Sequence, residues 1–232
     1  MDYFDFKQFR VYQDKSPFKV GTDSVLLGAW TDISHAEHIL DIGTGTGLLA
    51  LMLAQRTEVS ITALEPDSSS FMQAQENIDI SPWESRITVI NKRVQDFNPG
   101  LTFDLIVSNP PYFRQSLVNN DQHLAKARHD LDLTGTDLLT AARRLIAPGG
   151  AFCLVLPYTE ASIFIAEAAD YDLYCNKILK VKPLPSAPVK RMLMEFGAEK
   201  KELHQSFLTI ERARHKYTGD YKKLTRDFYP AF

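Results

Sequence analysis

The amino-acid sequence predicts an α/β protein with a doubly wound, Rossmann-like sheet of seven mostly parallel strands. From about residue 38, short β-rich runs alternate with helical stretches, and several runs are almost continuously apolar. Apolar runs of this kind are typical of strands that helices cover on both faces, and the alternation specifies parallel strands joined by crossover helices. Near the end of the chain, a proline-rich loop at residues 183–188 separates two strand candidates, which indicates an antiparallel terminal pair.

The expected elements follow one another in the order that this fold requires. Strands are expected at residues 38–42, 60–64, 87–91, 103–108, 151–156, 177–181 and 191–196, where β-branched and apolar residues gather. Helices are expected between them, at residues 47–55, 67–78, 135–146 and 160–169. The sequence Pro148-Gly149-Gly150 should end the third of these helices and turn the chain into the next strand.

A single domain is expected, since the 232 residues contain no internal repeat, low-complexity tract or long linker. Residues 1–37 would be an N-terminal extension, residues 38–200 the core and residues 201–232 a basic C-terminal extension. No apolar run approaches the roughly 20 residues of a membrane-spanning helix, and the acidic, aromatic start does not suit a signal peptide. We therefore expect a cytoplasmic protein. Neither cysteine has metal-ligand spacing, and we expect no metal.

The charge is unevenly distributed along the chain. The net charge is only −3, which argues against a generally nucleic-acid-binding surface. Between residues 177 and 226, however, thirteen Lys and Arg residues face five acidic ones. This asymmetry indicates a polyanionic partner, and the alternative interpretation is a solvated lysine-rich face.

A glycine-rich turn follows the first expected strand and precedes a helix. Its glycines are Gly43, Gly45 and Gly47, and glycine allows both unusual backbone angles and the close approach of a ligand. The dinucleotide fingerprint requires Gly-x-Gly-x-x-Gly, but Leu48 stands where the third glycine should be. Asp41, at the end of the strand, would also repel a negatively charged pyrophosphate. It would suit a ligand that carries an ammonium group, so a nicotinamide oxidoreductase is disfavoured.

This segment closely resembles the first motif of the class I S-adenosylmethionine-dependent methyltransferases. The resemblance implies that Asp41 and the Gly43–Gly47 loop bracket the methionine part of S-adenosyl-L-methionine. It also implies that Glu65, which ends the second strand, binds both ribose hydroxyls, as a carboxylate that accepts two hydrogen bonds can. Asp96 stands where that family contacts the adenine amino group.

The tetrapeptide Asn109-Pro110-Pro111-Tyr112 follows the fourth strand, at the sheet edge where such folds bind ligands. An exocyclic aromatic amine is a poor nucleophile, because its lone pair is delocalised into the ring. The Asn109 side-chain oxygen and the Pro110 carbonyl are two acceptors that could bind both N–H groups and orient the lone pair. Pro111 restricts Pro110 to the extended region, and Tyr112 offers a flat face for a flipped-out base. Catalysis would rest on positioning and polarisation.

Asn-Pro-Pro-Tyr occurs in nucleic-acid adenine-N6, release-factor glutamine-N5 and some rRNA guanine-N2 methyltransferases, and the N-terminal residues distinguish between them. Residues 4–14 (FDFKQFRVYQD) and 18–30 (FKVGTDSVLLGAW) resemble the bacterial tRNA1(Val) (adenine(37)-N6)-methyltransferase family, and the resemblance extends to residues 224–229 (LTRDFY). It implies N6-methylation of adenine 37 in this tRNA, recognised near the anticodon stem. It also implies that Lys19–Asp23 is the segment that closes over the methionine end of the cofactor, with Lys19, Gly21 and Thr22 as cofactor-binding residues.

Several basic residues are candidates for RNA contacts. They are Arg114, Arg128, Lys190, Arg191, Arg212, Arg214 and Lys216. Those within the loop 113–133 fit an RNA contact or a solvated loop equally well, because the loop carries no substrate-specific motif. The oligomeric state stays open.

Two alternatives to an RNA adenine-N6 enzyme remain. A protein glutamine-N5 or rRNA guanine-N2 methyltransferase would use the same acceptors, since a carboxamide also presents two N–H groups. Only about 37 residues precede the first core strand, which is too few for the helical domain of the glutamine-N5 enzymes. An inactive cofactor-binding scaffold that only binds RNA is disfavoured by the intact tetrapeptide.

Overall fold

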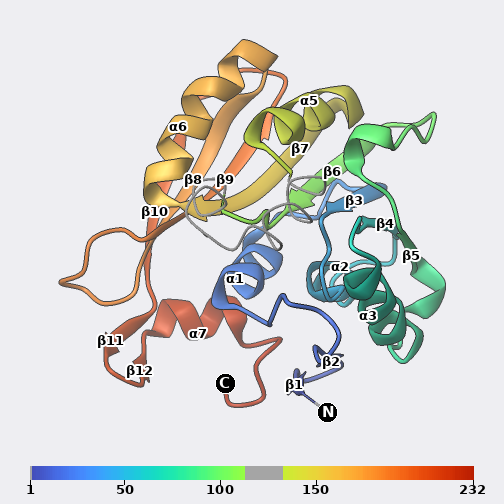
Figure 1. Ribbon diagram of the computed structural model, residues 1–232. Helices are drawn as coiled ribbons and strands as arrows, with labels where there is room; N and C mark the ends of the chain where they lie inside the picture. Colours follow the sequence, from blue (N-terminus) through green and yellow to red (C-terminus); the bar gives the residue numbers. More distant parts are fainter. Residues whose placement is uncertain (1, 113–132) are drawn as a thin grey trace, which may run out of the picture.

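The computed structural model describes residues 2–112 and 133–232, and it confirms the α/β fold class with helices on both faces of a central sheet (Figure 1). In the described residues this sheet has eight strands in the order β10-β8-β9-β7-β6-β3-β4-β5. The strands are β3 (His38–Ile42), β4 (Ser60–Leu64), β5 (Ile87–Ile90), β6 (Phe103–Ser108), β7 (Ile146–Pro157), β8 (Tyr174–Lys182), β9 (Arg191–Gly197) and β10 (His204–Thr209).

Strands β3 to β7 pair in parallel, and β9 lies antiparallel between β7 and β8. The expected antiparallel pair is therefore present, but it does not form the edge. The sheet has one strand more than the seven expected, because β10 pairs in parallel with β8 and forms the edge itself. Only Leu208 of its six residues is buried, so β10 lacks the apolar run by which the other strands are recognised.

Helices α1 (Thr22–Trp30), α2 (Leu48–Ala54), α3 (Ser68–Asp79) and α7 (Gly219–Thr225) lie on one side of the sheet, and α5 (Gly135–Leu145) and α6 (Tyr158–Ala168) on the other (Figure 1). The four expected helices are confirmed to within two residues at each end. Helices α1 and α7 were not expected. None of the helices in the described part of the chain is long and apolar enough to cross a membrane.

The sequence Pro148-Gly149-Gly150 was expected to end α5, but it does not. The helix ends at Leu145 and strand β7 begins at the next residue. Pro148–Gly150 instead lies in an irregularity of β7, where the pairing with β6 skips from Ile146 to Ala151. Gly149 has a φ of 78°, a left-handed conformation that glycine adopts without strain.

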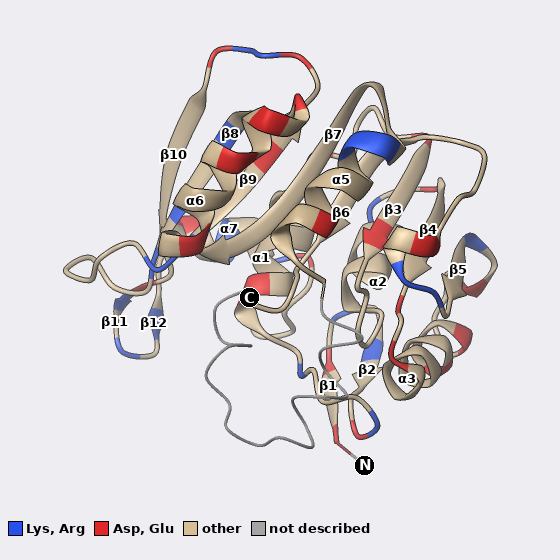
Figure 2. Cartoon of the chain, turned by 45° about the horizontal axis from the view of Figure 1, so that its top comes forward, with Lys and Arg blue, Asp and Glu red and all other residues tan. Residues whose placement is uncertain are grey.

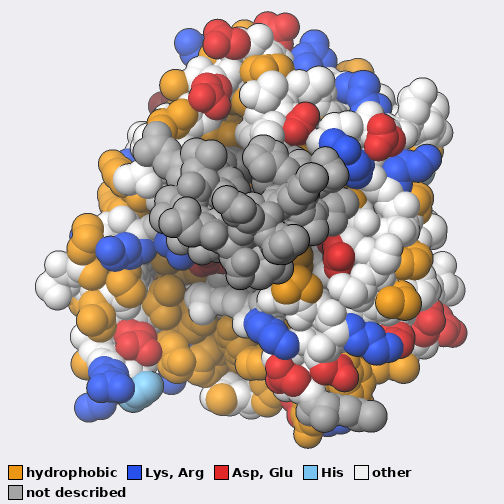
Figure 3. Space-filling view, in the orientation of Figure 1, with side chains coloured by type: hydrophobic (Ala, Val, Ile, Leu, Met, Phe, Trp, Pro, Cys, Tyr) orange, Lys and Arg blue, Asp and Glu red, His pale blue; other side chains and the backbone are white. Residues whose placement is uncertain are grey.

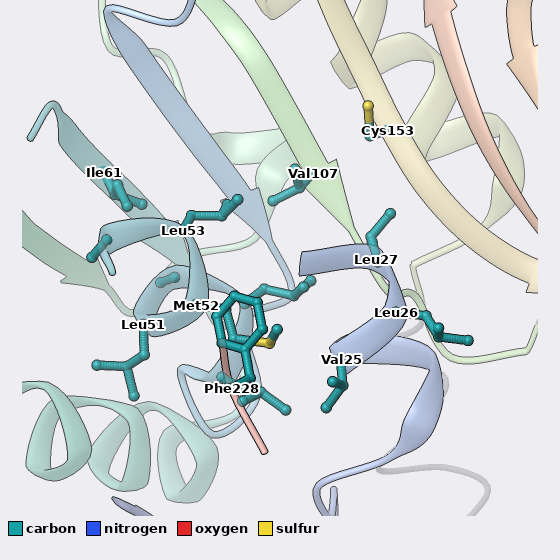
Figure 4. Close-up of a cluster of buried hydrophobic side chains, with 14 of the residues drawn as sticks. Val25, Leu26, Leu27, Leu51, Met52, Leu53, Ile61, Val107, Cys153 and Phe228 are labelled. Carbon is teal, nitrogen blue, oxygen red and sulfur yellow. The ribbon is translucent and has the colours of Figure 1, made fainter. Parts of the chain in front are cut away.

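Two apolar clusters fill the space between the sheet and its two helical layers. Figure 4 shows side chains of α1 and α2 in the first cluster, among them Leu27 and Met52, together with Phe228 from the C-terminal region. A Cβ atom on Gly28 would lie 2.9 Å from the Met52 sulfur, so glycine allows α1 and α2 to pack closely. The residues of α1 that pack here, Val25–Gly28, are completely buried or nearly so.

The two ends of the chain pack against each other. The N-terminal hairpin consists of β1 (Tyr3–Asp5) and β2 (Arg10–Tyr12), and a second hairpin of β11 (Glu211–Ala213) and β12 (Lys216–Tyr217) precedes α7. The backbone N–H of Lys7 donates to the carbonyl of Phe228 at 2.8 Å. The Lys7 ammonium also donates to the backbone carbonyls of Arg226 and Phe232, at 2.5 and 2.7 Å.

Candidate active site

The glycine-rich loop lies between the carboxyl ends of β3 and β4. Gly43, Gly45 and Gly47 have φ angles of 73°, 60° and 84°, which side-chain-bearing residues rarely adopt. The backbone N–H groups of Gly43 and Thr44 both donate to the Leu64 carbonyl at 2.9 Å, so the loop is tied to the end of β4. A Cβ atom on Gly43 would meet nothing within 4 Å, which leaves open space at this point of the loop.

Asp41 of β3 is completely buried beneath this loop. Its Oδ2 accepts a hydrogen bond from the Thr44 hydroxyl at 2.5 Å, and its Oδ1 has no hydrogen-bond partner among the described residues. Burial and, to a smaller extent, the nearby Glu65 carboxylate raise the pKa of Asp41 from its ordinary 3.8 to about 7. A buried carboxylate oxygen without a partner is costly. The site therefore fits a ligand that brings a cationic donor, such as the ammonium group of S-adenosylmethionine.

Glu65 directly follows β4 and is 4% exposed. Its two carboxylate oxygens accept hydrogen bonds from the backbone N–H groups of Gly45 at 2.8 Å and Asp67 at 3.0 Å. Burial raises its pKa. The side chain thus holds the glycine loop, and each carboxylate oxygen can still accept a second hydrogen bond. Asp96 lies in the short helix η2 (Val94–Asp96) after β5, where its side chain is exposed.

The segment from Tyr12 to Val20 lies along α3 beside the glycine loop. The Asn77 side chain of α3 binds both the N–H and the carbonyl of Tyr12 and also the Thr46 carbonyl, each at 2.8 Å. The Ser16 and Ser70 hydroxyls lie 2.9 Å apart, and a Cβ atom on Gly45 would lie 3.7 Å from the Phe18 Cβ. The segment is thereby fixed at the edge of the loop.

Three residues of this region were expected to contact the cofactor. The Lys19 ammonium donates to the Asp2 carboxylate at 3.0 Å and to the Gln13 carbonyl at 2.5 Å, so its hydrogen bonds are made within the N-terminal segment. Gly21 is the N-cap of α1, and Thr22 is the first residue of that helix, on the surface.

The Asn109–Tyr112 tetrapeptide follows β6, which pairs with β3 so that Val107 is opposite Asp41. The Ser108 hydroxyl donates to the Ile42 carbonyl at 2.8 Å and ties the end of β6 to the end of β3. The Asn109 Nδ2 donates to the hydroxyl of Ser24 at 2.7 Å. Its Oδ1 makes no hydrogen bond with the described residues, so this oxygen can still accept one. Pro110 is buried, and Pro111 is exposed.

Tyr112 belongs to a polar group with Asp23 and Arg191. Its hydroxyl donates to Asp23 Oδ2 at 2.7 Å and accepts from Arg191 Nη2 at 2.8 Å. The Arg191 Nε donates to the same Asp23 oxygen at 2.7 Å, and the guanidinium carbon lies 5.0 Å from the centre of the Tyr112 ring. Burial and the Asp23 carboxylate raise the pKa of Tyr112 to about 12, so the hydroxyl remains protonated at neutral pH.

Comparison with known proteins agrees with this geometry. The methyltransferase small domain family matches residues 16–161. A tRNA1(Val) (adenine(37)-N6)-methyltransferase of Bacteroides fragilis is 47% identical, with 98% of this chain and 97% of the relative aligned. The chain belongs to the tRNA1(Val) (adenine(37)-N6)-methyltransferase family. A second member, from Parabacteroides distasonis, is 44% identical over 98% of this chain and 97% of its own.

The fold of this tRNA methyltransferase family member also matches solved structures. A predicted O-methyltransferase from Agrobacterium tumefaciens superimposes with a TM-score of 0.68, covering 89% of this chain and 96% of that one. Its sequence is 21% identical, so this likeness concerns the fold alone.

The basic residues of the methyltransferase fall into two groups. Lys190, Arg212, Arg214 and Lys216 are exposed, and the last three belong to the β11–β12 hairpin, where basic side chains gather (Figures 2 and 3). Arg191 instead lies in the site, because β9 is antiparallel and its first residue is opposite Pro157, the last residue of β7. Its charge is already paired with Asp23. Arg114 and Arg128 lie outside the described residues.

Asp23 and Ser24 contact both ends of the tetrapeptide. Sequence reasoning placed Asp23 only in the segment that closes over the cofactor, and it missed Ser24. A signal was present, since Thr-Asp-Ser before an apolar run is a typical beginning of a helix. That signal predicts the helix and not the contacts. Among the described residues of the methyltransferase, no group of three or more His, Cys, Asp and Glu side chains could hold a metal ion.

Proposed function

We propose that this chain transfers the methyl group of S-adenosylmethionine to the exocyclic nitrogen N6 of adenine 37 in tRNA1(Val). The observation that carries the proposal is the Asn109 amide, whose nitrogen is engaged by Ser24 while its oxygen remains an acceptor. This acceptor stands two residues beyond the point where β6 pairs with Asp41, the buried carboxylate with an unpaired oxygen. The groups that bind the cofactor and the substrate would thus meet at the carboxyl ends of the parallel strands.

Three features would hold the cofactor. Asp41 Oδ1 would accept from its ammonium group, the glycine loop would leave room for its methionine part, and Glu65 would accept from its ribose hydroxyls. When bound, S-adenosylmethionine supplies an electrophilic methyl group on a positively charged sulfur. Asp96 would contact its adenine amino group, and the Lys19–Asp23 segment would close over its methionine end.

The tetrapeptide would act on the adenine. Asn109 Oδ1 and the Pro110 carbonyl would each accept one N–H of the exocyclic amine, which directs its lone pair out of conjugation and toward the methyl group. Tyr112 would support the flipped-out base by stacking, with the Arg191 guanidinium already against its ring. No strong base is needed, because the methylated nitrogen carries a positive charge and releases its proton to water. The rate would come from alignment and polarisation.

The RNA would be held through its phosphates. Lys190 and the β11–β12 hairpin residues Arg212, Arg214 and Lys216 are exposed basic side chains without a salt-bridge partner among the described residues. We assign them to the anticodon-stem region of the tRNA. The chain would act as one domain, in which residues 1–37 close the cofactor site, residues 38–200 form the catalytic core and residues 201–232 face the RNA.

A single substitution tests this function. Asn109→Ala removes one of the two acceptors, so the turnover of tRNA should fall by roughly 10²–10³-fold, as for other preorganised polar groups. Calorimetric titration should give an affinity for S-adenosylmethionine close to that of the wild type, since Asn109 lies outside the cofactor pocket. Asn109→Asp keeps an acceptor and should retain partial activity.

The substrate class is tested separately. Wild-type protein is incubated with labelled S-adenosylmethionine and either total tRNA, DNA or release factor. Label should enter the tRNA at N6 of adenine. Label in release factor alone would replace the proposal with a glutamine-N5 activity, and native turnover by Asn109→Ala would refute the mechanism for any substrate.

A further inference from the structure

The orientation of the Asn109 amide decides whether the tetrapeptide can bind an amine. A side-chain amide has a donor end and an acceptor end that are almost equal in size. If Nδ2 faced the adenine amine, two donors would oppose each other and no hydrogen bond would form. The site therefore needs a second group that favours the orientation in which Oδ1 faces the substrate.

Ser24 is in the position to hold the amide in this orientation, because its hydroxyl can accept from Nδ2 while Oδ1 faces the amine. Its hydroxyl oxygen accepts from Asn109 Nδ2 at 2.7 Å, across 85 residues of sequence, and both side chains are only half-buried. The hydroxyl belongs to the first turn of α1, and the residues that follow it, Val25, Leu26 and Leu27, have no exposed surface. Because this part of α1 is fixed in the core, the Ser24 oxygen has a fixed position relative to the sheet.

The next residue along the same turn makes a similar contact at the other end of the tetrapeptide. Asp23 accepts from the hydroxyl of Tyr112 and from the guanidinium of Arg191. The first turn of α1 thus contacts Asn109 and Tyr112 through adjacent residues, while Asp23 is occupied by its own partners. Ser24 is the described residue that binds the Asn109 side chain.

We propose that Ser24 is a positioning residue for methyl transfer, which holds the Asn109 amide with its oxygen toward the substrate amine. This inference rests on the proposed function, because it concerns the role of Asn109 in that reaction. Ser24 itself would touch neither the adenine nor the cofactor. Its loss should consequently lower the turnover number and leave the binding of both substrates unchanged.

The matched pair Ser24→Thr and Ser24→Val tests this role, since the two side chains have nearly the same shape and differ by the hydroxyl. The turnover number should be about tenfold lower for Ser24→Val than for Ser24→Thr, which corresponds to one hydrogen bond of about 1.4 kcal/mol. The KM for tRNA and the Kd for S-adenosylmethionine, measured by calorimetry, should agree within about twofold. Equal turnover of the two variants would overturn the proposal, as would an effect confined to KM or Kd.

A double-mutant cycle separates positioning of Asn109 from a general effect on the site. In an Asn109→Ala background there is no amide to orient, so the difference between Thr and Val at position 24 should disappear in single-turnover measurements. A difference that persists in this background would contradict the proposal. Ser34→Ala is the control, because Ser34 is exposed and precedes the amino end of β3, whereas the site lies at the carboxyl ends of the parallel strands.

The side-chain amide of Asn109 gives a readout that does not depend on activity. Its NH₂ protons should exchange with water more slowly in Ser24→Thr than in Ser24→Val, as observed by NMR of protein labelled with ¹⁵N-asparagine. The two hypotheses also fail differently. Native turnover by Asn109→Ala would remove the proposed mechanism, whereas an essential Asn109 with equal Thr and Val variants would remove the role of Ser24 alone.

Discussion

Replacing Asp41 by asparagine should make the protein more stable and bind its cofactor less well. Burial raises the pKa of Asp41 from 3.8 to about 7. The folded state thus holds this proton more tightly than the unfolded state, and the free energy of unfolding falls as the pH rises from 3.8 to about 7. The shift corresponds to a loss of about 4 kcal/mol, which is complete above pH 7.

Asparagine does not ionise, so Asp41→Asn avoids this loss at pH 8. The variant leaves an unpaired amide donor where Oδ1 was, at a cost of about 1–3 kcal/mol. The net gain in stability should be on the order of 1–3 kcal/mol, and each kcal/mol raises the Tm of a protein of this size by about 2–4 °C. At pH 5 only about 1.6 kcal/mol of this loss has accrued, because only the carboxyl of the unfolded chain has ionised there. The cost of the unpaired amide donor offsets this amount, so the gain should vanish at pH 5.

Thermal melts at pH 5, 6, 7 and 8, with and without S-adenosylmethionine, test both effects. The Tm difference between Asp41→Asn and the wild type should increase with pH. Saturating cofactor should raise the Tm of the wild type more, because the variant lacks the charge that meets the ammonium group. A Tm difference that does not depend on pH would refute the raised pKa of the buried Asp41 carboxyl. Equal increases of Tm on addition of the cofactor would refute the contact between Asp41 and the ammonium group.

Three further predictions concern the rest of the site. Glu65→Ala removes an acceptor for the ribose hydroxyls, so the affinity for S-adenosylmethionine should fall by an amount equivalent to about 1.5–3 kcal/mol in calorimetric titration; wild-type affinity would refute the assignment. Tyr112→Phe should lower turnover by less than about tenfold, because Arg191 keeps its direct bond to the Asp23 carboxylate. Tyr112→Ala should lose about 1–3 kcal/mol of stacking. Equal turnover of the Phe and Ala variants would exclude stacking. Lys216→Ala should reduce the salt dependence of tRNA binding by about one phosphate contact, whereas Arg191→Ala should affect turnover. A KM for tRNA that does not depend on salt would exclude phosphate binding by the hairpin.

The sequence predicted the parts of the fold in which burial leaves a clear pattern. Strands β3 and β6 are almost continuously apolar because helices cover both of their faces. Strand β10 escaped prediction because it is an edge strand with mostly exposed side chains. Helix α1 escaped because its central residues are buried on all sides, which removes the polar face that marks an amphipathic helix.

The same distinction applies to the site. Asp41 lies near the end of β3, and Glu65 and Asn109 directly follow β4 and β6. Because the carboxyl ends of these parallel strands lie together, the proximity of the three residues is predictable from the sequence. The contact of Arg191 with Tyr112 is not, since it depends on β9 running antiparallel between two other strands. Counting basic residues grouped Arg191 with the RNA candidates, because a count does not reveal its partly buried ion pair with Asp23.

The contacts between Lys7 and the C-terminal region have a consequence for the synthesis of the protein. Lys7 and Arg226 are separated by 219 residues, so at about 5–20 residues per second the N-terminal hairpin waits roughly 10–45 s for its partner. During this time Phe6, Phe9 and Val11, which the finished protein buries, lack part of their cover. Contacts between such distant residues also slow folding, because a large loop must close before they form. The nascent chain is thus exposed to aggregation until the residues around Arg226 have been synthesised, and the contacts of the N-terminal hairpin with them are among the last to form.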